Sequence, residues 1–427
     1  MNLKIRVALA ALACSLLSMR AGEPLQLADL VTTALANNPE ILAAQKDYEA
    51  ARQRPARESS LPDPTLSLGY SSNGGPLPGQ QLGQSPTSNI GLSVSQEIPF
   101  PGKRRLRGDI AAKEAEAEFW RYQAVQLNVR SRVIQAYHRL HHTYAALDIL
   151  QHGKELLVET LRVSEARYSA GKTAQQDIFK AQVQLSMMEI RIIRLQQERT
   201  VTEVEINSLL NRVPGSPLGE PINDEPGALP MTLDDLLAKA SANSPELERR
   251  LKIIARNELR VNLARENLHT DYTISAGYFN QGTMPAMYQA RVDIPLQIHA
   301  DRNQRHALNE QVDLLSQTRR NFEAGEQDLQ FRVRETWAAA ETAWRLVKIY
   351  DDTILPQSQL TVDSSIAGYE SGATDFVSVL NNLATRIDVE QQRHEEEMNF
   401  EVAVARLEEM TGVELSKLDL PEGNKAK

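Results

Sequence analysis

The sequence predicts an α+β fold built from two copies of one unit, each with a pair of strands followed by a long helical coil. Three observations carry this prediction: an internal repeat, alternating apolar and polar residues before each coil, and long stretches without proline. Residues 25–41 read LQLADLVTTALANNPEI and residues 231–247 read MTLDDLLAKASANSPEL, with eight identical positions. Because the copies lie about half a chain apart, they indicate a duplicated domain-sized unit and not a short solenoid repeat.

The composition favours long helices over a large compact core. The chain has 427 residues, of which 24% are charged and only 5% are aromatic. The net charge of −9 argues against a nucleic-acid partner, because such a partner requires a basic face. The sequence contains no Gly-rich phosphate loop, no Cys/His metal framework and no nucleophile elbow. We therefore expect no enzyme activity and no cofactor.

Residues 1–21 have the pattern of an export signal peptide. Lys4 and Arg6 give a positive start, and residues 7–17 form a short apolar run rich in Ala and Leu. This run is too short to span a bilayer as a helix, which takes roughly 20 residues. No other segment comes close to that length, so any insertion into a membrane must use strands.

Cys14 is the only cysteine, so no disulfide within the chain is possible. It ends the run Ala11-Leu12-Ala13-Cys14, which loosely resembles a bacterial lipoprotein cleavage box. Two interpretations stay open at this point. Cys14 is either the site of lipidation, or part of an apolar signal core that is discarded after cleavage near Ala21.

The chain divides into two repeats, expected over residues 22–211 and 232–412. A Pro/Gly-rich linker over residues 212–231 joins them, and residues 413–427 show little pattern and are expected to form a mobile tail. Each repeat begins with helix that restarts at a proline, since helices favour proline in the first turn.

Each repeat then shows the alternation of a half-buried strand pair, expected over about 65–99 and about 272–297. Leu66, Leu68 and Tyr70 alternate with small or polar residues, and both pairs end in an Ile-Pro step. The second repeat places one apolar face on Tyr272, Ile274, Ala276 and Tyr278, and another on Tyr288, Ala290, Val292, Ile294 and Leu296.

A long helical coil follows each strand pair, over 103–211 in the first repeat and 299–412 in the second. Each coil turns at a tip, at 168–174 and 369–375, where Tyr168-Ser-Ala-Gly171-Lys-Thr173 aligns with Tyr369-Glu-Ser-Gly372-Ala-Thr374. Glycine commonly ends a helix in the left-handed conformation, and Thr173 and Thr374 are expected to cap the helices that follow. Pro356 is expected to allow a kink in the second coil.

Four strands per chain cannot close a barrel, and open sheet edges are not tolerated in lipid. Several chains must therefore share one barrel, and three chains supply about twelve strands, an even number within the outer-membrane range. The predicted fold is an α+β membrane channel: a trimeric 12-stranded β-barrel with four strands per chain, continuing into a long α-helical coiled-coil barrel.

In this order and repeated twice, these features resemble the TolC-type outer-membrane efflux protein family, the outer membrane factors. The resemblance rests on the duplication, the two Pro-Glu restarts, the strand pairs ending in Ile-Pro and the Tyr-x-x-Gly turns. It implies a homotrimer in outer-membrane lipid of a Gram-negative bacterium, with a large periplasmic portion. It also implies a periplasmic adaptor (membrane fusion) protein and an inner-membrane pump of the RND type as partners.

The cargo of such a channel stays open in the sequence. The run Gln96 to Arg104, QEIPFPGKR, resembles the CzcC/CusC-like heavy-metal efflux branch and favours heavy-metal cations. The alternative is a multidrug duct of the same architecture. A soluble periplasmic coiled-coil adaptor would share the signal and the helices but would lack an apolar strand face, and an exported enzyme would need a cluster of titratable residues.

The resemblance places a narrow periplasmic entrance at the coil tips, with acidic residues just after the glycine turn. The family's usual carboxylate positions fall on Ser378 and Asn381, Asp375 lies one turn earlier, and Asp177 matches Ser378 in the first repeat. Symmetry copies of Asp177 or Asp375 would give the neck negative charge that attracts cations. Alternatively, both aspartates only stabilise the positive end of a helix dipole.

Two further interpretations concern the tip itself. Tyr168 and Tyr369 either latch neighbouring coils by hydrogen bonds or pack beside the turn. Gly171 and Gly372, with Thr173 and Thr374, are expected to mark the surface that contacts the adaptor.

The remaining candidates are metal ligands and a basic run. His138, His141 and His142 lie at helical spacing, and Met284 and Met287 lie in the expected second hairpin loop; either set could bind a transition metal, or remain solvated. Cations at a helix start oppose the helix dipole. The basic run is therefore expected to contact lipid headgroups or to form a hydrated collar: Lys103, Arg104, Arg105 and Arg107.

Overall fold

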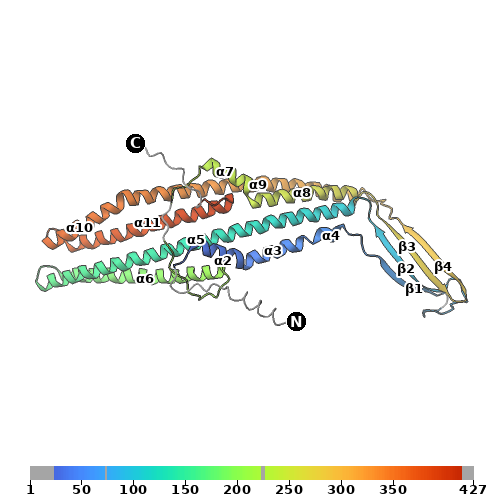
Figure 1. Ribbon diagram of the computed structural model, residues 1–427, viewed down its shortest axis with the longest axis horizontal. Helices are drawn as coiled ribbons and strands as arrows, with labels where there is room; N and C mark the ends of the chain where they lie inside the picture. The colour runs from blue at the N-terminus through green and yellow to red at the C-terminus, as the bar shows by residue number, and fades with distance from the viewer. Residues whose placement is uncertain (1–23, 73–74, 223–226, 416–427) are drawn as a thin grey trace, which may run out of the picture. The chain divides into compact units, whose positions relative to one another are not determined.

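A computed structural model describes residues 24–72, 75–222 and 227–415 of the chain. The expected export signal, Cys14 and most of the expected tail lie outside the described residues. Figure 1 shows the order of the elements, in which helices, a strand pair and a long coil occur in each half.

The first half begins with three helices, α2 (Leu27–Asn37), α3 (Pro39–Ala51) and α4 (Arg54–Ser59). Strands β1 (Thr65–Ser71) and β2 (Asn89–Ile98) follow, and then helices α5 (Lys103–Ser169) and α6 (Gln175–Leu209). The second half has α7 (Leu233–Asn243), α8 (Pro245–Glu266), β3 (Tyr272–Gln281), β4 (Met284–Asp293), α9 (Gln304–Ile349), a π-helical turn η1 (Tyr350–Ile354), α10 (Leu355–Ser371) and α11 (Phe376–Thr411).

The helix restart of the repeat has a clear physical cause in the first copy. Asn38 is extended in its backbone, and its side-chain oxygen accepts from the backbone N–H of Glu40 at 2.9 Å, which caps α3. The same side chain donates to the carbonyl of Leu209 at 2.9 Å, so it also joins α3 to the end of α6. Pro39 and Pro245 begin α3 and α8 respectively, where a missing N–H costs nothing.

The four strands form one antiparallel sheet in the order β1-β2-β3-β4 (Figure 1). Residues directly opposite one another share a face, so one row of the sheet is Leu68, Leu92, Tyr278 and Tyr288. All four side chains of that row are exposed. The predicted alternation therefore gives the sheet a continuous apolar face that nothing in the described part of the chain covers.

The opposite face of the sheet is made mostly of small and polar side chains. One of its rows runs through Ser67, Ser93, Gly277 and Gln289. Phe279 and Met287, which lie opposite one another, are the apolar exceptions in the next row. The sheet thus separates an apolar side from a polar side across its whole width.

The first coil is a single long helix up to its tip, whereas the second is interrupted. Helix α5 has 67 residues and α6 has 35, so α5 alone is about 100 Å long at 1.5 Å per residue. In the second coil the α-helix gives way to the π-helical turn η1 just before Pro356. Proline lacks an N–H and clashes with the carbonyl four residues earlier, which explains the break at this position.

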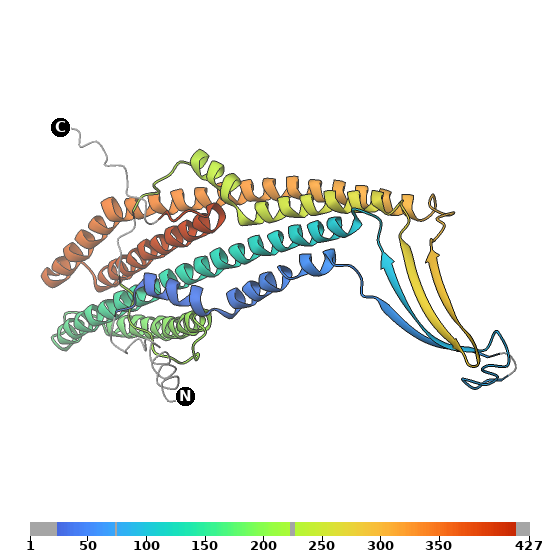
Figure 2. The ribbon, with the colours of Figure 1, turned by 45° about the vertical axis from the view of Figure 1, so that its right-hand side comes forward.

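The chain forms two compact units that do not coincide with the two repeats. The coil unit comprises Met1–Leu42, Ala124–Ser244 and Asp328–Lys427, and the sheet unit comprises Ala43–Gln123 and Pro245–Gln327. Each unit therefore combines segments from both halves of the sequence. In the coil unit, α10 and α11 run side by side towards the tip (Figure 2).

The tips of the two coils pack against each other through an apolar core. Its members come from all four tip helices, and Phe376 and Val379 of α11 are 1% exposed. The core comprises Ile149, Leu150, Leu157, Ala181, Met188, Ile192, Tyr369, Phe376, Val379, Leu380, Leu383 and Ile387. Among the described residues, no helix is both long and apolar enough to cross a membrane.

Candidate functional site: the coil tips

Both tip turns depend on a glycine in the left-handed conformation. Gly171 has φ of 72° and Gly372 has φ of 82°, values that cost other residues roughly 1–2 kcal/mol. The N–H of Gly171 donates to the carbonyl of Tyr168 at 2.8 Å, and that of Gly372 donates to Tyr369 at 3.1 Å. A Cβ would meet nothing within 4 Å at Gly171. The requirement for glycine there is therefore one of backbone conformation and not of space.

The two tips are joined by an arginine that the sequence analysis did not single out. The guanidinium of Arg167, near the end of α5, lies 4.5 Å from the centre of the Tyr369 ring. It also donates to the carbonyl oxygens of Tyr369 and Glu370 at the end of α10. These carbonyls form the negative end of the helix dipole, where a cation is favoured. In the sequence, the one available signal for this contact is that an arginine stands directly before the tip tyrosine Tyr168.

The two tip tyrosines occupy different environments. Tyr369 is 5% exposed and its ring lies 5.4 Å from that of Phe376, whereas Tyr168 is 42% exposed. The buried hydroxyl of Tyr369 has no hydrogen-bond partner among the described residues. Within one chain Tyr369 therefore acts through its ring and its carbonyl, and not through a hydroxyl latch.

The expected threonine caps are wrong. Helix α6 has Ala174 at its N-cap position, and α11 has Asp375, whose side chain accepts from the N–H of Ser378 at 2.6 Å. Both α6 and α11 begin one residue later than they would if the threonine were the N-cap. Thr173 instead donates its hydroxyl to the carboxylate of Asp177 at 2.6 Å.

Asp375 is an exposed carboxylate with a defined capping role. Hydrogen bonds from Ser378, and to a smaller degree the charge of Lys180, lower its pKa below the usual value. Asp177 lies in the first turn of α6, where a negative charge also complements the helix dipole. The structure thus gives both aspartates a local function at a helix start.

Lys180 and Asn381 line one groove between α6 and α11. The groove is otherwise mostly apolar, with Phe179, Val183, Val377 and Leu380. Asn381 is exposed and Ser378 is half-buried. Lys180 places a cation close to Asp375, which the sequence analysis also missed, because the two residues are far apart in the chain.

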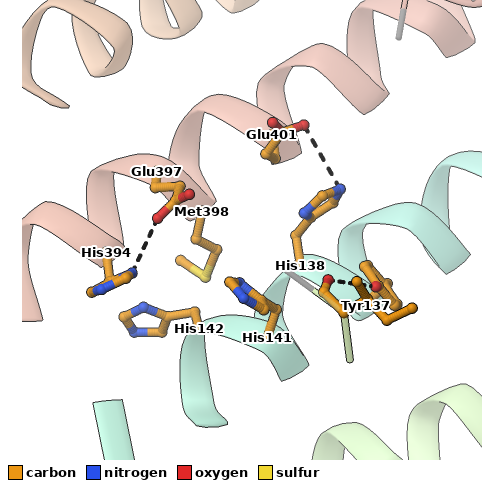
Figure 3. Close-up of a pocket in the computed structure, with 9 residues that line it drawn as sticks. Tyr137, His138, His141, His142, His394, Glu397, Met398 and Glu401 are labelled. Carbon is orange, nitrogen blue, oxygen red and sulfur yellow. Dashed lines mark hydrogen bonds and ion pairs between the residues drawn. The ribbon is translucent and has the colours of Figure 1, made fainter. Parts of the chain in front are cut away.

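The three histidines of α5 come together with residues of α11. His138, His141 and His142 line a small pocket with His394, Glu397, Met398 and Glu401 (Figure 3). In the described part of the chain, no three or more His, Cys, Asp or Glu side chains are placed to hold a metal ion. The predicted histidine metal site is therefore not formed as a three-ligand set.

Met284 and Met287 lie in strand β4 and not in a hairpin loop. Met287 is opposite Phe279, and Met284 is opposite Gln281 at the end of the sheet. Two residues lie between the methionines along the strand, and the register of the sheet shifts between their partners Phe279 and Gln281. The structure therefore corrects their placement, and their role as metal ligands stays a prediction.

In the basic run after β2, Lys103 and Arg104 are bonded to other parts of the protein. Lys103 is buried, with a side chain 3% exposed, and its ammonium lies 2.8 Å from the carboxylate of Asp271. It also donates to the carbonyl of His269 at 2.7 Å. Arg104 donates to the carbonyl of Ser59 at 3.0 Å. The expected lipid or solvent contact of Lys103 is therefore wrong, because this residue joins the ends of the two strand pairs.

Comparison with known proteins supports the interpretation of this fold. The profile of the outer membrane efflux protein family matches residues 30–212. The outer membrane protein TolC of Vibrio cholerae serotype O1 is 28% identical over 160 residues, and this match spans 37% of the chain and 36% of TolC. The family match covers most of the first repeat, including β1, β2 and the first tip.

Solved structures match over nearly the whole chain. CusC, described as forming a transmembrane channel, has a TM-score of 0.77 at 18% identity and covers 93% of this chain and 95% of its own. The outer-membrane channel OprN has a TM-score of 0.74 at 17% identity, with 90% and 89% covered. VceC from Vibrio cholerae has a TM-score of 0.75 at 14% identity, with 91% and 96% covered. At these identities the likeness shows the fold.

The whole chain has the fold of solved outer-membrane channels. Residues 30–212, somewhat less than half of the chain, match the outer membrane efflux protein family, and part of the chain is similar to TolC. The matched family is described by efflux, which agrees with the expectation that the chain is not an enzyme.

Proposed function

We propose that three copies of this chain form the outer-membrane channel of an export system, as a passive exit duct. The observation that carries the proposal is the exposed apolar face across the four-stranded sheet, which includes Leu68 and Leu92. Strands β1 and β4 are the edges of this sheet in the described chain. Open edges cannot lie in lipid, so closure requires strands from further copies.

Three copies would supply about twelve strands, which suits an outer-membrane barrel. The polar sheet face would line the water-filled interior, and the long coils would continue the duct in the periplasm. The coil tips would contact a periplasmic adaptor, and an inner-membrane pump of the RND type would supply the energy. Asp177 and Asp375 would then recur around the narrow entrance and favour cations.

The lipid-facing role of the apolar face can be tested with neighbouring residues of β1. Leu68→Lys places a charge on the apolar face, where the cost is about 2–4 kcal/mol at the bilayer midplane. Ser67→Lys places the same charge on the polar face of the same strand. We expect L68K to reduce the heat-resistant trimer in outer-membrane extracts, while S67K assembles normally. Equal assembly of the two variants would count against a barrel.

The proposed cargo is heavy-metal cations, an assignment that rests on the QEIPFPGKR run. A duct needs no tight metal site, because tight binding slows passage. The test is growth of a strain lacking this chain on graded copper, silver, zinc, cobalt, cadmium and nickel, beside dyes and antibiotics. Selective sensitivity to metals supports the proposal. Sensitivity to organic compounds alone would leave a multidrug duct of the same architecture.

The competing interpretation, a soluble periplasmic adaptor, predicts a different fractionation. An adaptor washes from membranes in alkaline carbonate, whereas a barrel requires detergent. The apolar sheet face disfavours the adaptor, because it would expose Leu68, Leu92 and Tyr288 to water.

A further inference from the structure

A cluster of histidines joins α5 to α11 inside the coil unit. His138, His141 and His142 come from α5, and His394, Glu397, Met398 and Glu401 come from α11 (Figure 3). We call these seven residues the histidine cluster. The cavity that they line with Tyr137 and Ile222 has a volume of about 20 Å³, enough for about one water molecule. Because the cavity is small and is lined by both α5 and α11, a change of charge in it acts directly on the contact between these two helices.

His138 is held neutral by its surroundings. Burial, and next the charge of His141, lower the pKa of His138 from 6.5 to about 4, although Glu397 opposes this shift. Glu401 of α11 faces the ring, with 3.7 Å between its carboxylate oxygen and Nε2 of His138. This distance is too long for a direct hydrogen bond. The carboxylate lies within ion-pair distance and would therefore compensate part, but not all, of the cost of charging a ring that is 16% exposed.

His142 is the second imidazole of the cluster and is half-buried. Burial lowers its pKa, while Glu395 of α11 and Glu198 of α6 raise it; the charge of His394 lowers it and a hydrogen bond to the backbone of His394 raises it. Its Nδ1 atom is buried and has no hydrogen-bond partner among the described residues. A proton on this atom would have no acceptor in the present arrangement, which costs free energy.

One acidic group of α11, Glu397, is already engaged by other cations. Glu397 is paired with Arg393, and His394 lies 3.0 Å from the same carboxylate. Arg393 also pairs with Asp351 of the π-helical turn at 2.9 Å. Protonation of His138 and His142 would therefore add positive charge close to Arg393 and His394, and Glu401 is the carboxylate within ion-pair distance of His138.

We propose that the histidine cluster is a proton-sensitive joint between α5 and α11, which is closed at neutral pH and loosens in mild acid. When the helices part, the imidazoles reach water and take up protons readily. Acid thus favours the separated state by mass action, and the coil unit would become more mobile as its surroundings acidify. The inference holds for any cargo and does not depend on the proposed function.

The sign and size of the effect follow from the two protonation states. A group whose pKa is lower in the closed state binds fewer protons there, so closure weakens as pH falls from about 6.5 towards 4. For His138 alone, the equilibrium constant for local opening should rise about tenfold between pH 7.5 and pH 5.5. At pH above about 7.5 it should be constant.

The test is hydrogen exchange of the full-length protein in detergent at pH 7.5 and 5.5, corrected for the intrinsic pH dependence of exchange. Segments over about 133–145 of α5 and 392–403 of α11 should lose about tenfold of their protection in acid. His138→Gln cannot be protonated and should remove most of this change. His152→Gln changes an exposed histidine on the same helix and should leave the change intact.

A second measurement keeps the proposal testable if H138Q fails to fold. Exchange of the imidazole C2 hydrogen in the unaltered protein reports the titration of each histidine separately. The proposal requires His138 to titrate below about pH 5 while His152 titrates at or above 6.5. A midpoint near 6.5 for His138, or equal acid sensitivity of H138Q and the unaltered protein, would overturn it.

Discussion

Arg167 joins the two coil tips by stacking on the ring of Tyr369, with 4.5 Å between the guanidinium carbon and the ring centre. Its donation to the carbonyls of Tyr369 and Glu370 ties the end of α5 to the end of α10. This contact is internal to one chain, so it restrains how far the two coils can separate at the tip.

Removal of Arg167 should loosen the tip. The cation–π contact and the charge-assisted hydrogen bonds together predict a cost of about 2 kcal/mol for Arg167→Ala. Hydrogen exchange over residues 165–172 and 366–373 measures this local stability. Arg162→Ala, an exposed arginine on the same helix, is the matched control. Equal protection in the two variants would mean that the contact contributes nothing.

Gly171→Ala should destabilise the first tip by about 1–2 kcal/mol, because its backbone is left-handed. Gly215→Ala adds the same methyl group in open space at a position without positive φ, and should change little. The measurement is the rate of limited proteolysis at the tip. A Gly171→Asn variant should recover part of the loss, because asparagine tolerates this conformation.

Substitutions of Asp375 separate its capping role from a pore charge. Asn is a good N-cap, so Asp375→Asn should keep α11 stable but lower the preference of the channel for cations. Asp375→Ala should lose the cap as well, at a cost of about 1 kcal/mol. Reversal potentials in a salt gradient measure the preference. An unchanged reversal potential in D375N would remove Asp375 from the proposed ring.

The same cap has a defined pH dependence. The pKa of Asp375 is lowered in the folded chain, chiefly by hydrogen bonds from Ser378. The contribution of the cap is therefore complete above the ordinary pKa of about 3.8 and is lost as pH falls through the lowered value. Hydrogen exchange at the start of α11, compared between pH 5 and pH 3, should show this loss, and D375N should not.

The Lys103–Asp271 pair should matter more than an exposed pair. Asp271→Ala leaves the buried ammonium of Lys103 without its carboxylate, which should cost about 3 kcal/mol of unfolding free energy. The measurement is guanidinium denaturation followed by a probe in the sheet unit. Asp293→Ala breaks an exposed pair with Arg291 and should cost less than about 1 kcal/mol. Replacing both partners, as Lys103→Met with Asp271→Leu, should recover most of the loss. No recovery would argue for a role beyond charge pairing.

The elements that repeat locally could be predicted from the sequence. The strand alternation around Leu68 and Leu92, the proline restarts and the glycine turns each follow from a short pattern with a single physical cause. The helix caps could not be placed as well, because the observed caps Ala174 and Asp375 each lie one residue after the predicted caps Thr173 and Thr374. Such boundaries are the least reliable part of any sequence-based assignment.

The contacts between distant segments could not be predicted at all. Nothing near His138 in the sequence indicates that His394 and Glu397 complete its pocket, and nothing near Lys103 points to Asp271. The histidines therefore looked like solvated residues or metal ligands, and Lys103 looked like a surface cation. Packing of the two repeats decides these environments, and a single sequence does not encode that packing as a local pattern.

The central claim is that copies of this chain form an open channel through the outer membrane. The most direct test is the conductance of the purified full-length protein in a planar lipid bilayer. The account predicts stepwise, long-lived conductance with a preference for cations, as expected for a water-filled barrel with acidic residues at its entrance. A protein that leaves membranes in alkaline carbonate and gives no conductance steps would contradict it.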